Sequence, residues 1–212
     1  MGRQPCTVTL DPPWPEKGGG EIKRGADRWY PTIGRKEDIL KVVLQSGAWP
    51  QWSKSDSAHC YMWVTNNYLA WGLWLMEALG FEYKTNLVWV KTIETWPRVL
   101  NHFIDDELGL ALDQESWSGI LGNMVRIGLG RYFRGSHELC LFGTRGPAAV
   151  PEKALPSVFL APRVRDEAGA EIHSRKPAEF FEIVEATSPG PYREFFARKS
   201  GRKRWSYWGN EV

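Results

Sequence analysis

The sequence predicts an α/β protein with a mostly parallel, doubly wound β-sheet and helices on both faces of that sheet. Two observations lead to this fold class. Short β-rich runs alternate along the chain with segments whose apolar residues follow helical spacing, and glycine, proline or asparagine marks the ends of several of them. The 212 residues suffice for one globular core, so we expect residues 1–212 to form a single domain.

The expected strands are short runs rich in β-branched and aromatic residues: 7–10, 59–64, 81–91, 136–144, 192–198 and 204–209. The expected helices carry apolar residues three and four positions apart. The first spans residues 36–47, and the second runs from an asparagine cap at position 66 or 67 to Gly80. The third has Pro177 in its first turn and ends near Thr187.

Two longer segments lack a regular pattern. Residues 15–35 contain several glycines and no apolar period, which indicates a mobile loop. Residues 93–130 contain two short apolar stretches broken up by Gly, Asp and Asn, and they are too long for an ordinary connection. We expect both segments to be substrate-binding elements, with residues 93–130 forming a lid or a recognition insert. A plain surface excursion fits residues 93–130 equally well.

Composition narrows the class of protein. The chain is 42% hydrophobic and 25% charged, as is usual for soluble globular proteins. No run approaches the ~20 apolar residues of a membrane span, so no membrane association is expected. The three cysteines, Cys6, Cys60 and Cys140, form no CxxC pair, which favours a cytoplasmic protein without structural zinc. The net charge of +2 neither demands nor excludes a nucleic-acid partner.

The end of the first expected strand indicates a ligand site. The strand at residues 7–10 stops at Asp11-Pro12-Pro13-Trp14, and ligands of open α/β sheets bind outside the carboxyl ends of the strands. Because proline has no N–H, the ladder cannot continue there. We therefore expect the carbonyls of Asp11 and Pro12 to be left free beside the Asp11 carboxylate. A plain Pro-Pro turn with a surface aspartate is the alternative.

A strand end with several hydrogen-bond acceptors and no N–H donor suits the binding of an exocyclic amine. The amino group of adenine is a weak nucleophile because its lone pair is delocalised into the ring. Two acceptors that hold its hydrogens would aim the lone pair at an electrophile. Of the 12 tryptophans, Trp14 and Trp29 lie in polar sequence rich in Gly and Pro. We expect these two to stack on a flat ligand rather than to join the core, a contact worth ~1–3 kcal/mol with a base.

Further motifs follow in order: LDPPW (10–14), YPTI (30–33), WVTNNYL (63–69), LVWVKT (87–92), GLGRYFRGSHELCLFGTRG (128–146), HSRKPAEFFEIVEATSPGP (173–191), EFFAR (194–198) and WGNEV (208–212). With these motifs the sequence resembles the MT-A70-like family of adenine-amino methyltransferases, which modify the N(6) nitrogen. The resemblance covers nearly the whole chain, apart from residues 15–27 and about 95–127. It implies a Rossmann-like methyltransferase fold with permuted motif order, in which DPPW precedes the cofactor-binding half.

The same resemblance implies S-adenosylmethionine as cofactor, without a metal, and assigns roles to particular residues. Asp11, Pro12, Pro13 and Trp14 form the catalytic motif, and Asp11 contacts both the target amine and the ammonium group of the cofactor. Lys176, just before a helix, pairs with the cofactor carboxylate, a position where anions are also favoured on general grounds. A solvated charge is the alternative for Lys176.

The remaining assignments concern the nucleoside part of the cofactor and the substrate. By the resemblance, the ribose and adenine of the cofactor lie against Glu194, Arg198, Asn210 and Glu211. The last two also fit an ordinary polar terminus. The residues expected to contact the substrate are Trp29, Tyr30, His137 and Glu138. His137 fits a polar strand end equally well.

Basic residues would complete a nucleic-acid site. We expect a rim for phosphates from Arg131, Arg134, Arg145, Arg193, Arg198, Lys199, Arg202, Lys203 and Arg204. Charge runs of this kind are also common on plain solvated faces.

The sequence thus predicts an S-adenosylmethionine-dependent enzyme that methylates adenine. DNA is favoured over RNA as substrate because the bacterial and phage members of the family are taken to act on DNA. We expect this chain to be of that type, in the cytoplasm of a bacterium or a phage-infected cell, with a homodimer or a partner subunit to help grip a long duplex. The alternatives are the same reaction on RNA and a non-catalytic nucleic-acid-binding subunit. Such subunits usually lose the acidic tetrapeptide, which this chain retains at residues 11–14.

Overall fold

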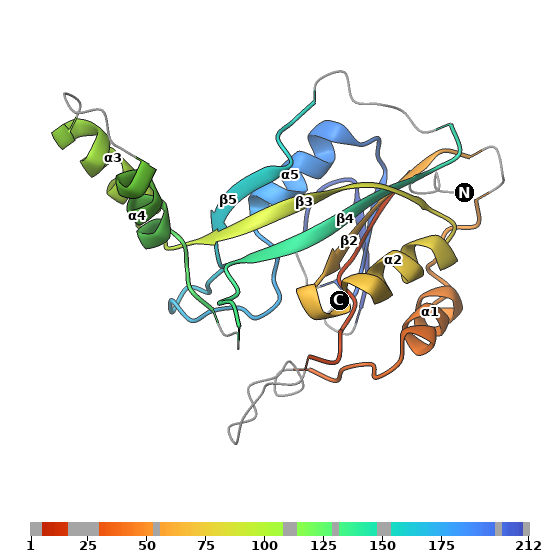
Figure 1. Ribbon diagram of the computed structural model, residues 1–212. Coiled ribbons are helices and arrows are strands. Elements are labelled where there is room, and N and C mark those ends of the chain that lie inside the picture. The colour runs from red at the N-terminus through yellow and green to blue at the C-terminus, as the bar shows by residue number, and fades with distance from the viewer. Residues whose placement is uncertain are drawn as a thin grey trace. The chain divides into compact units, whose positions relative to one another are not determined.

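The structure is a computed structural model, which describes residues 6–16, 30–52, 56–107, 114–128, 132–147, 154–197 and 201–209. Figure 1 shows the order of its elements along the chain. The strands are β1 (Thr7–Leu10), β2 (Ala58–Val64), β3 (Glu82–Thr92), β4 (His137–Arg145), β5 (Val158–Pro162), β6 (Tyr192–Phe195) and β7 (Trp205–Trp208). The helices are α1 (Lys36–Gln45), α2 (Leu69–Ala78), α3 (Trp96–Glu107), α4 (Gln114–Met124) and α5 (Ala178–Thr187), and a 3-10 turn at Asn66–Tyr68 precedes α2.

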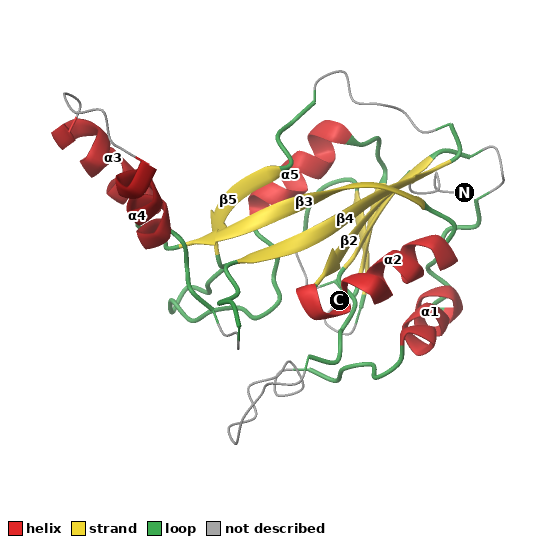
Figure 2. Cartoon of the chain, in the orientation of Figure 1, coloured by secondary structure: helices red, strands yellow, loops and turns green. Residues whose placement is uncertain are grey.

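Within the described residues, the strands form one seven-stranded sheet in the order β5-β3-β4-β2-β1-β6-β7. Figure 2 shows the strands in yellow, with β5, β3, β4 and β2 labelled. Strand β1 runs parallel to both β2 and β6, β6 runs parallel to β7, and β3 runs parallel to β5. Strand β4 is antiparallel to β2. The predicted mixed α/β class and the mostly parallel sheet are therefore confirmed. The antiparallel strand is an addition that the alternation of elements did not predict.

The chain divides into two compact units. The first unit comprises Met1–Leu87, Leu139–Ser157 and Phe181–Val212, and the second comprises Val88–Glu138 and Val158–Phe180. Strands β3 and β4 and helix α5 each contribute residues to both units. The expectation of a single domain stays a prediction.

In the first unit, one face of strands β1 and β2 forms the hydrophobic core. Val8, Leu10, Cys60 and Met62 alternate along these strands and are fully buried. They pack in one cluster with residues of α1 and α2, which include Ile39, Val43, Leu75 and Met76. Helix α2 can approach closely because Gly72 has no side chain: a Cβ there would lie 3.1 Å from both Val64 and Leu141.

The opposite face of β1 and β2 is polar and lies under the carboxyl end of α5. His59 Nδ1 and Tyr61 OH each lie 2.7 Å from the Ser188 hydroxyl, and Tyr61 OH lies 2.9 Å from Thr187 Oγ1. The Thr7 hydroxyl donates to the Pro189 carbonyl at 2.7 Å. Because α1 and α2 cover the other face, these two strands have helices on both sides, as a doubly wound sheet requires.

The second unit corrects the expectation for residues 93–130. This segment is not irregular within the described residues, because it contains α3 and α4. Its start is anchored to α4 where the Ile93 N–H donates to the Met124 carbonyl at 2.9 Å. Strand β5, which the sequence analysis missed, is held beside β3, and the Trp89 indole N–H donates to the Ala161 carbonyl at 2.8 Å. None of the helices in the described part of the chain has the length and apolar character that a membrane span requires.

Phe195, at the carboxyl end of β6, is expected to contribute strongly to the stability of the core. Phe195 is fully buried, with its ring centre 5.2 Å from that of Trp49. We expect Phe195→Ala to lower the free energy of unfolding by roughly 3–5 kcal/mol, because it removes the buried ring and leaves a cavity. Leu44→Ala serves as the control, because the Leu44 side chain on α1 is 48% exposed. It should change the free energy of unfolding by about 0.5 kcal/mol or less. Urea unfolding of the three proteins measures both values, and equal losses would show that Phe195 does not anchor the core.

Candidate functional site

The candidate site in the first unit begins where β1 ends. Asp11 directly follows β1, and its N–H donates to the Phe195 carbonyl of β6 at 3.4 Å. The register pairs Thr9 with Glu194 and Leu10 with Phe195. Parallel pairing therefore brings Asp11 and Glu194 to the same edge of the sheet, at the carboxyl ends of neighbouring strands. Ligands of α/β sheets bind at this edge.

The two carboxylates differ in their surroundings. Asp11 is partly exposed, whereas Glu194 is only 9% exposed and faces the same side of the sheet as Thr9. A buried carboxylate is costly unless it is paired or hydrogen-bonded, so the charge of Glu194 depends on its protein surroundings more than that of Asp11 does. Asp11 is the more accessible acceptor of the two.

The two prolines after Asp11 are held by the chain itself. The Pro12 carbonyl accepts the Trp14 N–H at 2.8 Å, and the Pro13 carbonyl accepts the Ile33 N–H at 3.0 Å. The expectation that the Pro12 carbonyl is left free is therefore wrong, because the tight turn brings an N–H back onto it. A carbonyl oxygen has two lone pairs, so Pro12 can accept a second donor.

Trp14 also differs from its expected role. The side chain is 3% exposed and belongs to the core cluster, so the expectation that it avoids the core is wrong. Its indole N–H donates to the Trp63 carbonyl at 3.0 Å, and its ring is stacked on Tyr68, with centres 6.0 Å apart and planes within 8°. The indole turns inward although the residues next to it in the sequence are prolines.

The second unit contains a charged cluster around Glu138. Lys176 Nζ lies 3.3 Å from Glu138 Oε2 and donates to the Ser174 carbonyl at 3.3 Å. Lys91 Nζ donates to the other carboxylate oxygen, Glu138 Oε1. Lys91 and Lys176 are each only 9% exposed, so the alternative of a solvated charge at Lys176 is wrong. The cluster places two ammonium groups on one carboxylate.

Electrostatics keep this cluster ionised. Burial alone would raise the pKa of Glu138, but the ammonium groups of Lys176 and Lys91 outweigh it and lower this pKa to about 2. Burial lowers the pKa of Lys91, although Glu138 opposes that change, and the other charges acting on Lys91 are the cations Arg163 and Lys176. Burial is therefore the main reason for the lowered pKa of Lys91, and Glu138 is the main group that opposes it.

Lys176 and Glu138 are predicted site residues, whereas Lys91 was not predicted from the sequence. The signal was present in the LVWVKT motif, in which a lysine follows four apolar residues near the end of a strand. A lysine at a buried strand position requires a partner, because an isolated buried charge is very costly. That partner is Glu138.

The remaining predicted site residues are only partly described. Trp29, Arg198, Asn210 and Glu211 lie outside the described residues. Tyr30 is half-buried in the segment before α1, and His137 begins β4 beside Glu138, also half-buried. Their expected contacts with cofactor and substrate stay predictions.

The expected basic rim is partly engaged in packing. Arg193 is half-buried, where it donates to the Ala48 carbonyl and, at 2.9 Å, to the Ser206 hydroxyl, and burial lowers its pKa. The guanidinium groups of Arg145, Arg202 and Arg204 lie 5.0–5.6 Å from the ring centres of Trp52, Phe181 and Tyr192, respectively. Arg134 and Lys203 are exposed, whereas Arg131, Arg198 and Lys199 lie outside the described residues. Arg193 is thus a packing residue rather than part of a solvated rim.

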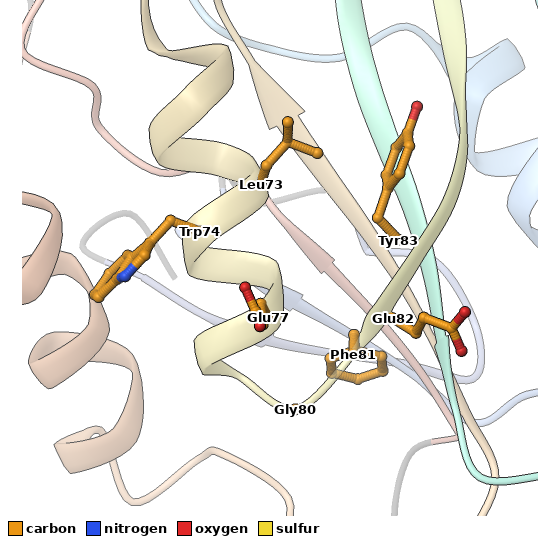
Figure 3. A pocket seen from close by; sticks show the side chains of 7 residues that line it. All are labelled: Leu73, Trp74, Glu77, Gly80, Phe81, Glu82 and Tyr83. Atoms are coloured by element: carbon orange, nitrogen blue, oxygen red, sulfur yellow. The ribbon is translucent and has the colours of Figure 1, made fainter.

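A pocket in the first unit contains none of these predicted residues. Its volume is about 680 Å³, and Figure 3 shows its lining from the end of α2 and the start of β3: Leu73, Trp74, Glu77, Gly80, Phe81, Glu82 and Tyr83. It is open at the amino end of β3, whereas the candidate site follows the carboxyl ends of its strands. Among the described residues, no three His, Cys, Asp or Glu side chains are grouped as a metal site would need.

The seven-stranded, mostly parallel sheet with carboxylates at adjacent carboxyl strand ends is compatible with a Rossmann-like methyltransferase fold. A protein of Medicago truncatula named "Putative N(6)-adenosine-methyltransferase MT-A70-like" is 26% identical to the chain over 155 residues. The match covers 72% of the chain and 20% of the Medicago protein, so the chain spans about a fifth of the length of this relative. No family model matches the chain. The chain is thus similar, over part of its length, to a protein whose name refers to the MT-A70 family and to adenosine methylation.

The lowered pKa of Glu138 implies that the contribution of this residue to stability depends on pH. A carboxyl group whose pKa is lowered on folding contributes stability above its unfolded pKa of about 4.5 and loses it as the pH falls through about 2. We expect the stability advantage of the wild type over Glu138→Gln to shrink between pH 4.5 and pH 2, by about 3 kcal/mol at most. Urea unfolding of both proteins at pH 7, 4 and 3 tests this, and an advantage that is independent of pH would exclude the ionised cluster.

Proposed function

We propose that the chain transfers the methyl group of S-adenosylmethionine to the exocyclic 6-amino group of adenine in DNA. The observation that carries the proposal is the place of Asp11. Its carboxylate follows a strand whose carboxyl end is closed by two prolines, and parallel pairing sets Glu194 on the neighbouring strand end. The similarity to the Medicago protein, whose name refers to adenosine methylation, points to the same chemistry.

The described residues fit the cofactor. Its amino-acid part carries one carboxylate and one ammonium group, and its ribose carries hydroxyl groups. Lys176 carries a nearly buried ammonium group beside Glu138, and its charge is the one that a carboxylate requires of a partner. Glu194, a nearly buried acceptor at a strand end, suits a hydroxyl or ammonium group. By the resemblance, Lys176 pairs with the carboxylate, Asp11 with the ammonium group, and Glu194, Arg198, Asn210 and Glu211 surround the nucleoside.

The chain acts on the amine by positioning it. When bound, S-adenosylmethionine would supply an electrophilic methyl group on a sulfonium, with the thioether S-adenosylhomocysteine as the leaving group. The Asp11 carboxylate accepts one N–H of the amine, and the Pro12 carbonyl accepts the other through its second lone pair. These contacts turn the nitrogen lone pair toward the methyl carbon and stabilise the positive charge that develops on the nitrogen. Asp11 receives the proton that the nitrogen then loses.

The buried Trp14 changes how the base would be held. Its indole is packed against Tyr68, so it orients the Pro12-Pro13 turn from within the core rather than serving as a stacking plate. Stacking on the base then falls to Trp29 and Tyr30, with His137 and Glu138 as polar contacts, as the resemblance implies. In this proposal the chain is of the bacterial or phage type, with the permuted motif order, and it acts as a homodimer or with a partner subunit.

RNA is the second candidate substrate, since the name of the Medicago relative specifies adenosine, the ribonucleoside. The test is to incubate the full chain with S-adenosylmethionine labelled in its methyl group and with DNA or RNA of matched sequence, and then to identify the modified nucleoside. Label in N(6)-methyldeoxyadenosine supports DNA, and label in N(6)-methyladenosine supports RNA. If nucleic acid is bound without any transfer of label, the chain is a non-catalytic binding subunit.

Asp11 should be essential for turnover. We expect Asp11→Ala to lower the rate of methyl transfer by ~10²–10³, because it removes a positioned electrostatic contact to the reacting amine. The substitution lies at a partly exposed position after β1, so the unfolding midpoint should stay close to that of the wild type. Near-normal turnover in a folded Asp11→Ala protein would remove this carboxylate from the site.

Lys176 should act on cofactor affinity, and Lys91 provides a matched control. Lys176→Gln and Lys91→Gln each remove one ammonium group from Glu138, so both should disturb the cluster. Only Lys176→Gln should also remove the charge-assisted hydrogen bond to the cofactor carboxylate, worth ~1.5–3 kcal/mol, or a roughly tenfold to hundredfold higher Kd. Calorimetric titration with S-adenosylhomocysteine measures this difference. Equal affinities of the two variants would contradict the assignment of Lys176.

A further inference from the structure

Three arginines in the second unit converge on one carboxylate. Arg126 Nη2 lies 2.5 Å from Glu171 Oε1, and Arg163 Nη1 lies 2.9 Å from Glu171 Oε2. Arg165 Nη2 lies 3.8 Å from Glu171 Oε1, and the same guanidinium also contacts Glu94 and, at 2.6 Å, the Gly169 carbonyl. Glu171 is mostly buried beneath them, with 18% of its side chain exposed. We call these three arginines and Glu171 the arginine cluster.

The arginine cluster is built at the carboxyl ends of β3 and β5. These strands are parallel and end at Thr92 and Pro162. Arg163 and Arg165 directly follow β5 on a short hairpin, where Arg165 forms a β-bridge with Glu171. Arg126 lies beside the end of β3, where its N–H donates to the Lys91 carbonyl at 2.7 Å. The hairpin with its bridge positions Arg163 and Arg165, and the hydrogen bond to Lys91 positions Arg126, at the sheet edge where α/β proteins bind ligands.

Among the described residues, the cluster has a surplus of positive charge. Both oxygens of Glu171 are already contacted, three guanidinium groups share this carboxylate, and in that part of the chain only Arg165 has a further one, Glu94. Arg163 also acts electrostatically on Lys91, which connects the cluster to the two-lysine site around Glu138. The side chains of Arg126, Arg163 and Arg165 are 37%, 30% and 38% exposed, so an incoming anion can reach them.

We propose that the arginine cluster binds backbone phosphates of the single-stranded nucleic acid that carries the target adenine. The proposal rests on the proposed function and adds a binding surface to it. Guanidinium groups present parallel N–H donors that match two phosphate oxygens, which is why arginine is favoured at phosphate sites. Glu171 acts as the internal counter-ion that keeps three like charges together while no phosphate is bound. A phosphate then competes with Glu171 for the outer N–H groups.

Salt dependence of binding tests the proposal. Fluorescence anisotropy with a labelled single-stranded DNA and an RNA of the same sequence, both containing one adenine, gives the affinity of the full chain across a series of salt concentrations. Log affinity falls as log salt concentration rises, and each lost phosphate contact should make this negative slope shallower by about 0.7 for a single strand. We expect this loss for Arg163→Gln and for Arg165→Gln, and about twice as much for the double variant.

Two further variants separate phosphate binding from a structural role. Lys41→Gln removes one cation from a surface pair on α1, where Lys41 Nζ lies 3.7 Å from Asp38, and should leave the slope unchanged. Glu171→Gln removes the competing carboxylate, so the affinity for the oligonucleotide should rise severalfold at low salt and the slope should steepen. A purely structural cluster predicts the reverse, a less stable protein with unchanged or weaker binding. Thermal unfolding of each variant identifies any that no longer fold, and the remaining variants then decide.

The outcomes distinguish this proposal from the proposed function. If the double variant binds both oligonucleotides with the wild-type slope, the arginine cluster does not contact phosphates, even if methyl transfer is observed. If the slope becomes shallower as expected but no label is transferred, the phosphate surface stands and the enzymatic proposal fails. A loss of slope for DNA alone or for RNA alone identifies which backbone the arginine cluster receives.

Discussion

The parallel pairing of β1 with β6 is the constraint on which the candidate site depends. It joins β1, near the start of the chain, to β6, near its end. The contact between the two segments already begins one residue before each strand, where the Cys6 N–H donates to the Pro191 carbonyl at 2.9 Å. Both strands contribute side chains to one core face and one polar face. A slip of one residue would exchange these faces, so burial of Val8, Leu10 and Phe195 fixes the register. That register sets Glu194 beside Thr9 and Asp11 one residue beyond Leu10.

Much of the first unit could be predicted because its strands are compact apolar runs that end in turn residues. Strands β1 and β2 lie within two residues of their expected bounds, and the strand-ending role of Asp11-Pro12 follows from the chemistry of proline alone. The antiparallel direction of β4 could not be predicted, because a strand buried on both faces has the same local pattern in either direction. Strand β5 was missed because Pro156 and Pro162 frame its short apolar run and give it the appearance of a loop.

The second unit was harder to predict for two physical reasons. Trp96, Val99, Leu100 and Phe103 repeat at the helical spacing that α3 bears out, but the Gly and Asn residues that follow weaken any helical pattern in the sequence. The charge clusters depend on contacts between residues far apart in the chain, such as Lys91 with Glu138. A charge pattern read along the sequence found the arginines that pack on aromatic rings. It did not identify the arginines around Glu171, because Arg126 lies far along the chain from Arg163 and Arg165, so that the three form no run of charge in the sequence.

The inward turn of Trp14 explains how a short acidic loop can be held in place. The Asp11 N–H donates a hydrogen bond to the Phe195 carbonyl of β6. Three residues later, the Trp14 indole N–H donates to the Trp63 carbonyl within the core. The intervening prolines have fixed φ angles, so the segment between the two anchors has little conformational freedom. In the proposed reaction, a backbone that is fixed before the substrate arrives limits how far the Asp11 carboxylate must reorganise, and preorganised electrostatic contacts contribute most to a rate. The same reasoning assigns the tryptophan of this motif a structural role: by its burial it sets the position of the aspartate.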